Sequence, residues 1–139
     1  KTLILPDSLT TLDNTNIKKI LDKECPDYIV DACDSRETKK EIIKEALRRK
    51  IRFISSMGTG NKFDPSQLEI TDIRKTVNDP LARIFRKWVK DNKITDKITV
   101  LSSRELPIKS GRVVASNSFV PNSAGLLITS YIIRKIIDM

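Results

Sequence analysis

The feature that most constrains the fold is an apolar segment that ends in two aspartates and leads directly into a helical pattern. Residues 28–31 read Tyr-Ile-Val-Asp, and Asp34 follows three positions after this segment. Residues 36–49 then carry apolar side chains at helical spacing, namely Ile42, Ile43, Ala46 and Leu47. A short apolar run follows at residues 51–54. The alternation predicts a strand, a helix and a strand of a parallel sheet, and such sheets bind ligands at the carboxyl ends of their strands.

Further elements are expected on both sides of this unit. The remaining strands are predicted at residues 1–5, 68–73 and 98–101, with an extended piece at 112–115, and the remaining helices at about 13–25, from Pro80, and at 122–137. The sequence therefore predicts an α/β fold with a Rossmann-like, mainly parallel sheet flanked by helices. A C-terminal extension of strands and an apolar helix completes it, and residues 1–139 are expected to form part of a single domain.

Two helices carry strong apolar faces. The helix from Pro80 places Leu81, Ile84, Phe85, Trp88 and Val89 on one side, so Trp88 is expected in the core or in an interface. The last helix is apolar almost all round and is expected to be buried, either in the sheet core or in a dimer interface. It is too short, and too interrupted by Thr129, Ser130, Arg134 and Lys135, to span a membrane.

Composition limits the chemistry that the chain can carry out. The 139 residues include no histidine, which excludes a mechanism that needs an imidazole from this chain. Cys25 and Cys33 are eight residues apart and make a poor zinc site, and Cys33 is expected to be a small buried side chain. Nothing suggests a disulfide framework, which fits a reducing cytoplasm.

The basic residues admit two interpretations. The net charge is +8, and lysines and arginines concentrate at residues 36–52 and 83–93. Such faces could contact the phosphate backbone of a nucleic acid, RNA included. They could equally be ordinary solvated helix surfaces.

The aspartates at the strand end carry the strongest chemical signal. Without histidine or paired cysteines, chemistry would depend on carboxylates, backbone amides and basic side chains, a set that suits nucleotide phosphates with Mg²⁺. Asp34 has a structural alternative as the N-cap of a capping box with Glu37. Asp31 could instead bond to nearby amides. The loop with Gly58 and Gly60 is only a weak phosphate-binding signal.

Several segments resemble one enzyme family. Residues 28–35 resemble the D-A-x-D-S segment of the superfamily of ubiquitin-activating enzymes and of the molybdopterin- and thiamine-pathway adenylyltransferases. The branch that fits best is that of the tRNA threonylcarbamoyladenosine dehydratases. Its motifs are matched by residues 58–65 (G-x-G-x-x-x-D-P), 70–76 with 79–82 (D-[IL]-x-K-T and D-P-L-A), and 116–121 with 124–125 (S-x-S-F-V-P and A-G).

The resemblance implies a function and roles for individual residues. In this family ATP activates the carboxylate of the threonylcarbamoyl group on tRNA as an acyl-adenylate, and the modification then cyclises with loss of water. Asp34 would be the catalytic carboxylate at Mg²⁺ and the ATP phosphates, with Ser35 and Ala32 beside the nucleotide. The resemblance also implies a homodimer, a cytoplasmic location, and a sulfur-acceptor or relay protein as a further partner.

One departure from the family is large. The preceding half, with the glycine-rich nucleotide loop and the basic residues that hold the triphosphate, is absent here, so the chain is expected to be the carboxyl-terminal part and inactive alone. Ser116 and Ser118 stand where some members have a cysteine. Two alternatives stay open: an adenylyltransferase that activates a ubiquitin-like sulfur carrier, although this chain lacks its Cys-x-x-Cys pairs, and a non-catalytic nucleic-acid-binding or dimerisation module.

Overall fold

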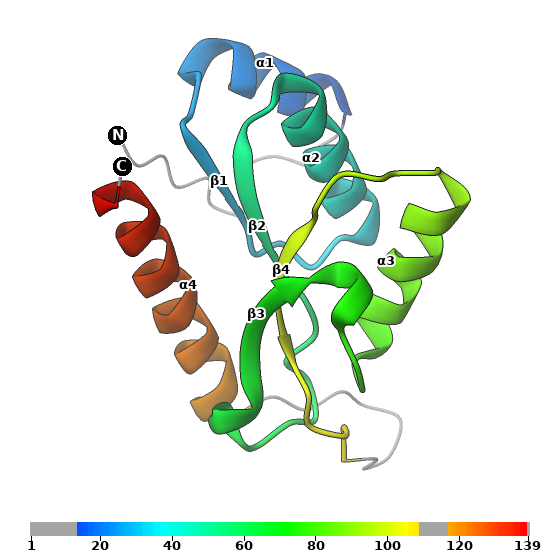
Figure 1. Cartoon of the computed structure of the whole chain (residues 1–139), viewed down its shortest axis with the longest axis vertical. Coiled ribbons are helices and arrows are strands. Elements are labelled where there is room, and N and C mark those ends of the chain that lie inside the picture. Colours follow the sequence, from blue (N-terminus) through cyan, green and yellow to red (C-terminus); the bar gives the residue numbers. More distant parts are fainter. Residues whose placement is uncertain (1–13, 109–116, 139) are drawn as a thin grey trace. The chain divides into compact units, whose positions relative to one another are not determined.

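The computed structural model describes residues 14–108 and 117–138, and the chain divides into two compact units, up to Ser55 and from Ser56 onward. The first unit holds α1 (Asn14–Glu24), β1 (Tyr28–Asp31), α2 (Arg36–Arg49) and nearly all of β2 (Arg52–Ser56). The second holds the 3-10 turn η1 (Pro65–Gln67), β3 (Leu68–Asp72), η2 (Ile73–Lys75), α3 (Pro80–Asp91), β4 (Thr99–Ser103) and α4 (Phe119–Ile137). The elements are labelled in Figure 1.

The first unit is a strand–helix–strand crossover. β1 and β2 run parallel, with Tyr28 opposite Arg52 and Asp31 opposite Ser55, and α2 connects them (Figure 1). α2 packs against β1 and α1 packs against α2. Its apolar core consists of Ile17, Leu21, Ile43, Ala46, Phe53 and Ile54. The parallel unit predicted for residues 28–54 is therefore confirmed.

An acidic side chain lies buried on α2 in the first unit. Glu45 is only 5% exposed and accepts hydrogen bonds from the guanidinium groups of Arg48, at 2.9 Å, and Arg49, at 3.0 Å. The hydrogen bond from Arg48, followed by that from Arg49, lowers the pKa of Glu45 against the opposing effect of burial. The carboxylate therefore keeps its charge to a lower pH than a solvated glutamate.

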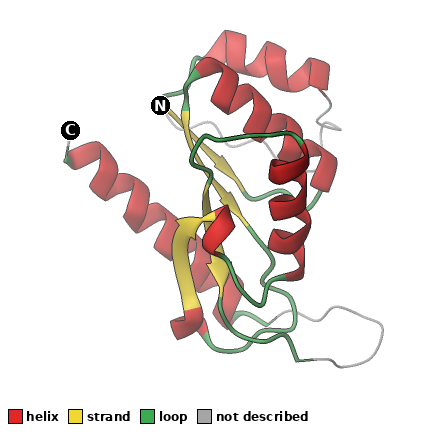
Figure 2. Cartoon of the chain, turned by 45° about the vertical axis from the view of Figure 1, so that its right-hand side comes forward, coloured by secondary structure: helices red, strands yellow, loops and turns green. Residues whose placement is uncertain are grey.

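The second unit is built on an antiparallel strand pair. β3 and β4 pair with Leu68 opposite Ser103 and Asp72 opposite Thr99, and Figure 2 shows both as neighbouring strands. α3 packs against η2, while α4 packs against η1 and β3. The buried apolar side chains are Met57, Ile73, Ala82, Phe85, Val89, Ile98, Val100, Leu101, Val120, Ala124 and Ile128.

The predicted α/β fold with strands flanked by helices is confirmed, while the mainly parallel character of the sheet stays a prediction. β1 and β2 pair in parallel and β3 and β4 pair antiparallel, so strand pairs of both kinds occur among the described residues. Every residue of β3 is partly exposed. The strand therefore does not divide into a buried face and a solvated face, as the alternation at residues 68–73 predicted.

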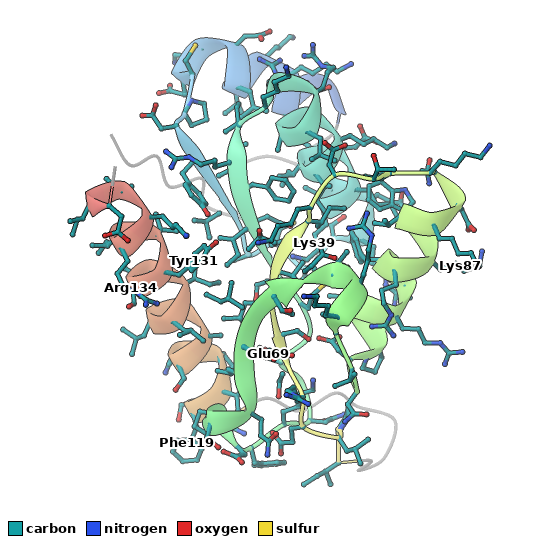
Figure 3. The ribbon with its side chains drawn as sticks, in the orientation of Figure 1. Lys39, Glu69, Lys87, Phe119, Tyr131 and Arg134 are labelled. Atoms are coloured by element: carbon teal, nitrogen blue, oxygen red, sulfur yellow. The ribbon has the colours of Figure 1, made fainter. Side chains whose placement is uncertain are left out.

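The last helix is not buried in the core of its own unit, and its burial in a dimer interface stays a prediction. α4 begins at Phe119, three residues earlier than expected, and buries only Val120, Ala124 and Ile128, which recur every four residues. Phe119, Leu126, Ile133, Ile136 and Ile137 are exposed, and Figure 3 labels Phe119, Tyr131 and Arg134 along the helix. The helix is thus not buried all round, because a single narrow face packs on its own unit.

The remaining sequence predictions concern Trp88, a membrane-spanning helix and two further strands. Trp88 is partly exposed rather than fully buried, with its ring edge-on to Phe85 at 6.0 Å between centroids. No helix in the described ranges is long and apolar enough to cross a membrane. The strands predicted at residues 1–5 and 112–115 lie outside the described residues.

Candidate functional site

The candidate site is the turn between the carboxyl end of β1 and the start of α2. Asp31 closes β1 and is 2% exposed, whereas Ala32, Asp34 and Ser35 are all exposed on the turn. The three residues predicted to contact a nucleotide therefore lie together at a strand end. This is the edge at which parallel strands present ligand-binding groups.

The N-cap of α2 is Ser35, not Asp34. Ser35 has extended backbone angles, φ −72° and ψ 120°, and its Oγ accepts a hydrogen bond from the Thr38 amide at 3.3 Å. α2 then begins at Arg36, so Glu37 is its second residue and pairs with Lys40 at 2.9 Å. The predicted capping box is wrong because the serine oxygen, one residue later, has the reach to Thr38.

Asp34 is thereby left without a capping role. Its carboxylate makes no hydrogen bond or ion pair with any residue between 14 and 108 or between 117 and 138. Nearby, the Arg36 and Glu37 amides at the first turn of α2 also lack partners within the same ranges. Amides of this kind at a helix N-terminus bind phosphate oxygens.

These groups fit Mg²⁺ bound with a nucleotide better than a metal held by protein alone. The described residues contain no group of three or more acidic, cysteine or histidine side chains that could hold a metal ion. Mg²⁺ commonly takes one or two protein carboxylates and completes its shell with phosphate oxygens and water. A single exposed carboxylate matches the protein share of this donor set, and the free amides suit the phosphate oxygens.

Asp31 is held in a buried network, part of which the sequence did not indicate. Its Oδ1 accepts from the Cys33 amide at 3.1 Å, as expected of a strand-end aspartate bonded to nearby amides. Its Oδ2 accepts from Ser55 Oγ at 2.6 Å and from Lys39 Nζ at 3.2 Å, and neither partner was predicted. One signal was present, since Lys39 shares the stripe of Ile43 and Ala46 at spacings of four and three.

Cys33 is not a reactive thiol in this setting. Its Sγ donates to Asp31 Oδ1 at 3.0 Å, and the side chain is partly buried. Burial, followed by the hydrogen bond to Asp31 and its negative charge, raises the pKa of Cys33 to about 12. The thiol therefore remains protonated at neutral pH, which agrees with the expectation of a structural cysteine more closely than with a nucleophile.

The glycine loop that follows β2 is fixed by its own unit. The Glu105 carboxylate accepts from the amides of Phe63 and Asp64, each at 2.9 Å, and Lys62 Nζ donates to the Ser103 carbonyl at 3.0 Å. A Cβ on Gly58 would lie 3.3 Å from Asp79 Oδ1, so glycine permits this close approach. The carboxylate of Glu105 uses amides that a phosphate would need, which weakens the phosphate-cradle interpretation further.

The fold and the site together define a class of protein. A parallel strand that ends in aspartates, followed by a helix whose N-terminus has free amides, is typical of nucleotide-binding α/β proteins. No family model matches the chain.

Relatives of known name narrow the class to one family. The chain is 34% identical over 129 residues to the tRNA threonylcarbamoyladenosine dehydratase of Bacillus subtilis, covering 80% of this chain and 51% of the relative. It is 39% identical over 99 residues to tRNA threonylcarbamoyladenosine dehydratase 2 of Saccharomyces cerevisiae, covering 71% of this chain and 22% of the relative. The chain is thus a homologue of the tRNA threonylcarbamoyladenosine dehydratases, and the family predicted from the motifs is confirmed.

A solved structure supports the same relationship. The Escherichia coli dehydratase TcdA in complex with ATP matches with a TM-score of 0.82 and 25% identity, over 93% of this chain and 55% of that chain. The chain therefore spans about half the length of the Bacillus relative and of this structure.

Proposed function

We propose that the chain is the carboxyl-terminal part of an ATP-dependent tRNA threonylcarbamoyladenosine dehydratase, and that residues 1–139 complete a nucleotide-binding domain begun by a preceding half. The observation that carries the proposal is the exposed Asp34 carboxylate, free of any capping role, in a chain 34% identical to a dehydratase of that name. The substrate would be tRNA that carries threonylcarbamoyladenosine.

The proposed reaction assigns a limited task to this chain. ATP would convert the threonylcarbamoyl carboxylate into an acyl-adenylate with release of pyrophosphate, and attack on that carbonyl within the same modification would close the ring. Asp34 would hold Mg²⁺ at the ATP phosphates, because its carboxylate is accessible and unpaired. Ala32 and Ser35 would line the nucleotide, and the groups that grip the triphosphate would come from the preceding half.

The basic residues suggest which helix would meet the tRNA. On α2 most of the positive charge is neutralised, since Lys40, Lys44, Arg48 and Arg49 pair with acidic side chains and Lys39 is buried. On α3, Arg83 and Lys90 are exposed and have no acidic partner within the described residues, while Lys87 pairs with Asp91 on the outer side (Figure 3). We therefore place phosphate contacts on α3, in a cytoplasmic enzyme.

The exposed apolar residues of α4 support a homodimer. Leu126 and Ile137 are each 74% exposed, and Phe119 is 62% exposed. A run of such side chains is costly to leave in water, and association of two copies would cover it. Leu126→Glu should shift the sedimentation of the complete polypeptide toward the monomer, whereas Lys135→Glu, exposed on the opposite side of the same helix, should act as the matched control. A sulfur-acceptor or relay protein is the other partner that the family resemblance suggests.

The test of the function uses the complete polypeptide that carries this chain. It would be incubated with ATP, Mg²⁺ and tRNA bearing threonylcarbamoyladenosine. The tRNA would then be digested, and the masses of its nucleosides would be measured by mass spectrometry. We expect ATP-dependent loss of one water, and no turnover by Asp34→Ala. Asp27→Ala is the matched control, because Asp27 is an exposed aspartate at the opposite end of β1.

Two results would contradict the proposal. An unchanged nucleoside, together with ATP–pyrophosphate exchange stimulated by a ubiquitin-like protein, would point to a sulfur-carrier adenylyltransferase. Full activity of Asp34→Ala would remove Asp34 from the site.

A further inference from the structure

The first unit buries an ion pair beneath the candidate site. Lys39 Nζ lies 3.2 Å from Asp31 Oδ2, and the two side chains are 2% and 0% exposed; Lys39 is labelled in Figure 3. Ser55 Oγ donates to the same carboxylate oxygen at 2.6 Å and lies 3.5 Å from Lys39 Nζ. The cluster of Asp31, Lys39 and Ser55 thus joins the end of β1, the first turns of α2 and the end of β2.

The other oxygen of Asp31 holds the turn that carries Asp34. Asp31 Oδ1 accepts from the backbone amide of Cys33 at 3.1 Å and from its thiol at 3.0 Å. The two carboxylate oxygens of Asp31 therefore bind different parts of the unit. One binds the start of the turn, and the other is fixed to α2 and β2 through Lys39 and Ser55.

The far end of the turn is fixed to the same helix. The Lys39 amide donates to the Ser35 carbonyl at 3.0 Å, and Ser35 caps α2. Asp34 stands between Cys33 and Ser35, so both of its chain neighbours are anchored to groups of the cluster while its own carboxylate is free. The structure thus holds the backbone of Asp34 rigidly and leaves its side chain available.

Stability alone does not account for such a cluster. Burying a charged pair costs desolvation that its attraction offsets only in good geometry, and apolar residues of the same size often stabilise a fold as well or better. What a buried, fully bonded pair does provide is a fixed arrangement of the elements it joins. Misplacement of a reacting group by about 1 Å can lower a rate roughly a hundredfold.

We propose that Asp31, Lys39 and Ser55 are positioning residues that hold the Asp34 carboxylate in place for metal-bound ATP. This inference rests on the proposed function and deepens it, since it assigns three buried side chains to the site. None of the three would touch the nucleotide. Each would act through the turn at residues 32–35.

The test compares variants of the complete polypeptide in the tRNA dehydration assay. Lys39→Met removes the buried charge and keeps a side chain of similar length, and we expect kcat to fall at least about tenfold with a higher Mg²⁺ requirement. Lys44→Met is the matched control, because Lys44 is on the same helix and forms a solvent-exposed pair with Glu41 at 3.0 Å. We expect this control to keep the wild-type kcat and Mg²⁺ dependence.

Two further variants separate positioning from folding. Asp31→Asn combined with Lys39→Met removes both charges, so the melting temperature should recover relative to Lys39→Met alone while kcat stays low. Ser55→Ala removes the hydroxyl that donates to Asp31 and accepts from Lys39, but it leaves both charges in place and should fold, so it provides a result even where Lys39→Met does not. We expect it to lower kcat several-fold and to raise the Mg²⁺ requirement in the same direction.

The outcomes distinguish this inference from the proposed function. The positioning role would be overturned if folded Ser55→Ala and the folded Asp31→Asn/Lys39→Met double variant kept the wild-type kcat and Mg²⁺ dependence and differed only in melting temperature. The dehydratase proposal would then still stand. Absence of ATP-dependent water loss by the wild type would overturn both.

Discussion

The assignment of the α2 cap to Ser35 in place of Asp34 predicts that substitutions at these two adjacent positions differ in how salt affects the loss of stability. Ser35→Ala removes the Oγ that accepts from the Thr38 amide at 3.3 Å. Loss of an N-cap typically costs about 0.5–2 kcal/mol. Because the bond is long and the site is exposed, water can replace part of it, and we expect about 1 kcal/mol.

Asp34→Ala should behave differently. The carboxylate has no hydrogen bond to lose within the described residues, so only its attraction to the positive end of α2 is removed. That term is about 0.3–1 kcal/mol at low ionic strength and is screened by salt. We expect the stability loss of Asp34→Ala to vanish near 1 M NaCl, while turnover of tRNA is abolished at any salt concentration.

The measurement is urea unfolding of the complete polypeptide, followed by far-UV circular dichroism at low and high salt. Ser35→Ala should lose nearly the same free energy of unfolding at both salt concentrations, because a cap hydrogen bond between neutral groups is weakly screened. A larger salt-independent loss for Asp34→Ala than for Ser35→Ala would show that Asp34 caps the helix. The reasoning from cap to ligand would then be refuted.

Three other predictions follow from the first and second units. The pKa of Glu45 is lowered chiefly by its hydrogen bond from Arg48, so this carboxylate contributes stability that is complete above its ordinary pKa of 4.5 and is lost as the pH falls below that value toward the lower folded-state pKa. Glu45→Gln should therefore flatten the acid part of the curve of unfolding free energy against pH. Identical acid curves for the wild type and the variant would exclude a stabilising charge on Glu45. Trp88→Ala should lower the free energy of unfolding by about 1–3 kcal/mol, less than truncation of a fully buried tryptophan, because the Trp88 side chain is partly exposed. A decrease above about 4 kcal/mol, measured by urea unfolding, would contradict this prediction. Cys25 is exposed and should react with iodoacetamide at pH 8 far faster than Cys33, whose pKa is raised to about 12. Peptide mass spectrometry measures the labelling rate of each cysteine. Faster labelling of Cys33 would contradict its hydrogen bond to Asp31.

Local signals in the sequence were sufficient for several elements. Asn78-Asp79-Pro80 predicts a helix start, and Asp79 indeed caps α3, with its Oδ1 accepting from the Ala82 amide at 3.0 Å. Proline at the first helical position and aspartate before it act within one turn of chain. The strand–helix–strand unit was predictable for the same reason, because hydrophobic periodicity is set by the element's own geometry.

Sequence reasoning was wrong or incomplete where two neighbouring residues are equally suitable helix caps, or where the packing partner of an element is distant in the sequence. Asp34 and Ser35 are both good cap residues, and only the backbone angles at Ser35 decide between them. The apolar residues of α4 indicate burial without naming the surface that covers them, and the helix packs only Val120, Ala124 and Ile128 on its own unit. Strand direction at residues 68–72 depends on pairing with residues 99–103, which no local pattern encodes.

Lys39 shows how far sequence reasoning could have gone at the site. A lysine is almost never fully buried without a partner, yet Lys39 shares the stripe of Ile43 and Ala46, both of which are buried on α2. Its position therefore implies an acidic partner beneath the helix, and the strand that precedes α2 ends in Asp31. The contribution of Ser55, sixteen residues beyond Lys39 and 24 beyond Asp31, depends on the register of β1 against β2. A buried lysine on an apolar helical stripe next to a strand-end aspartate is thus a sequence signal for a fixed turn, and in this chain that turn carries the exposed Asp34.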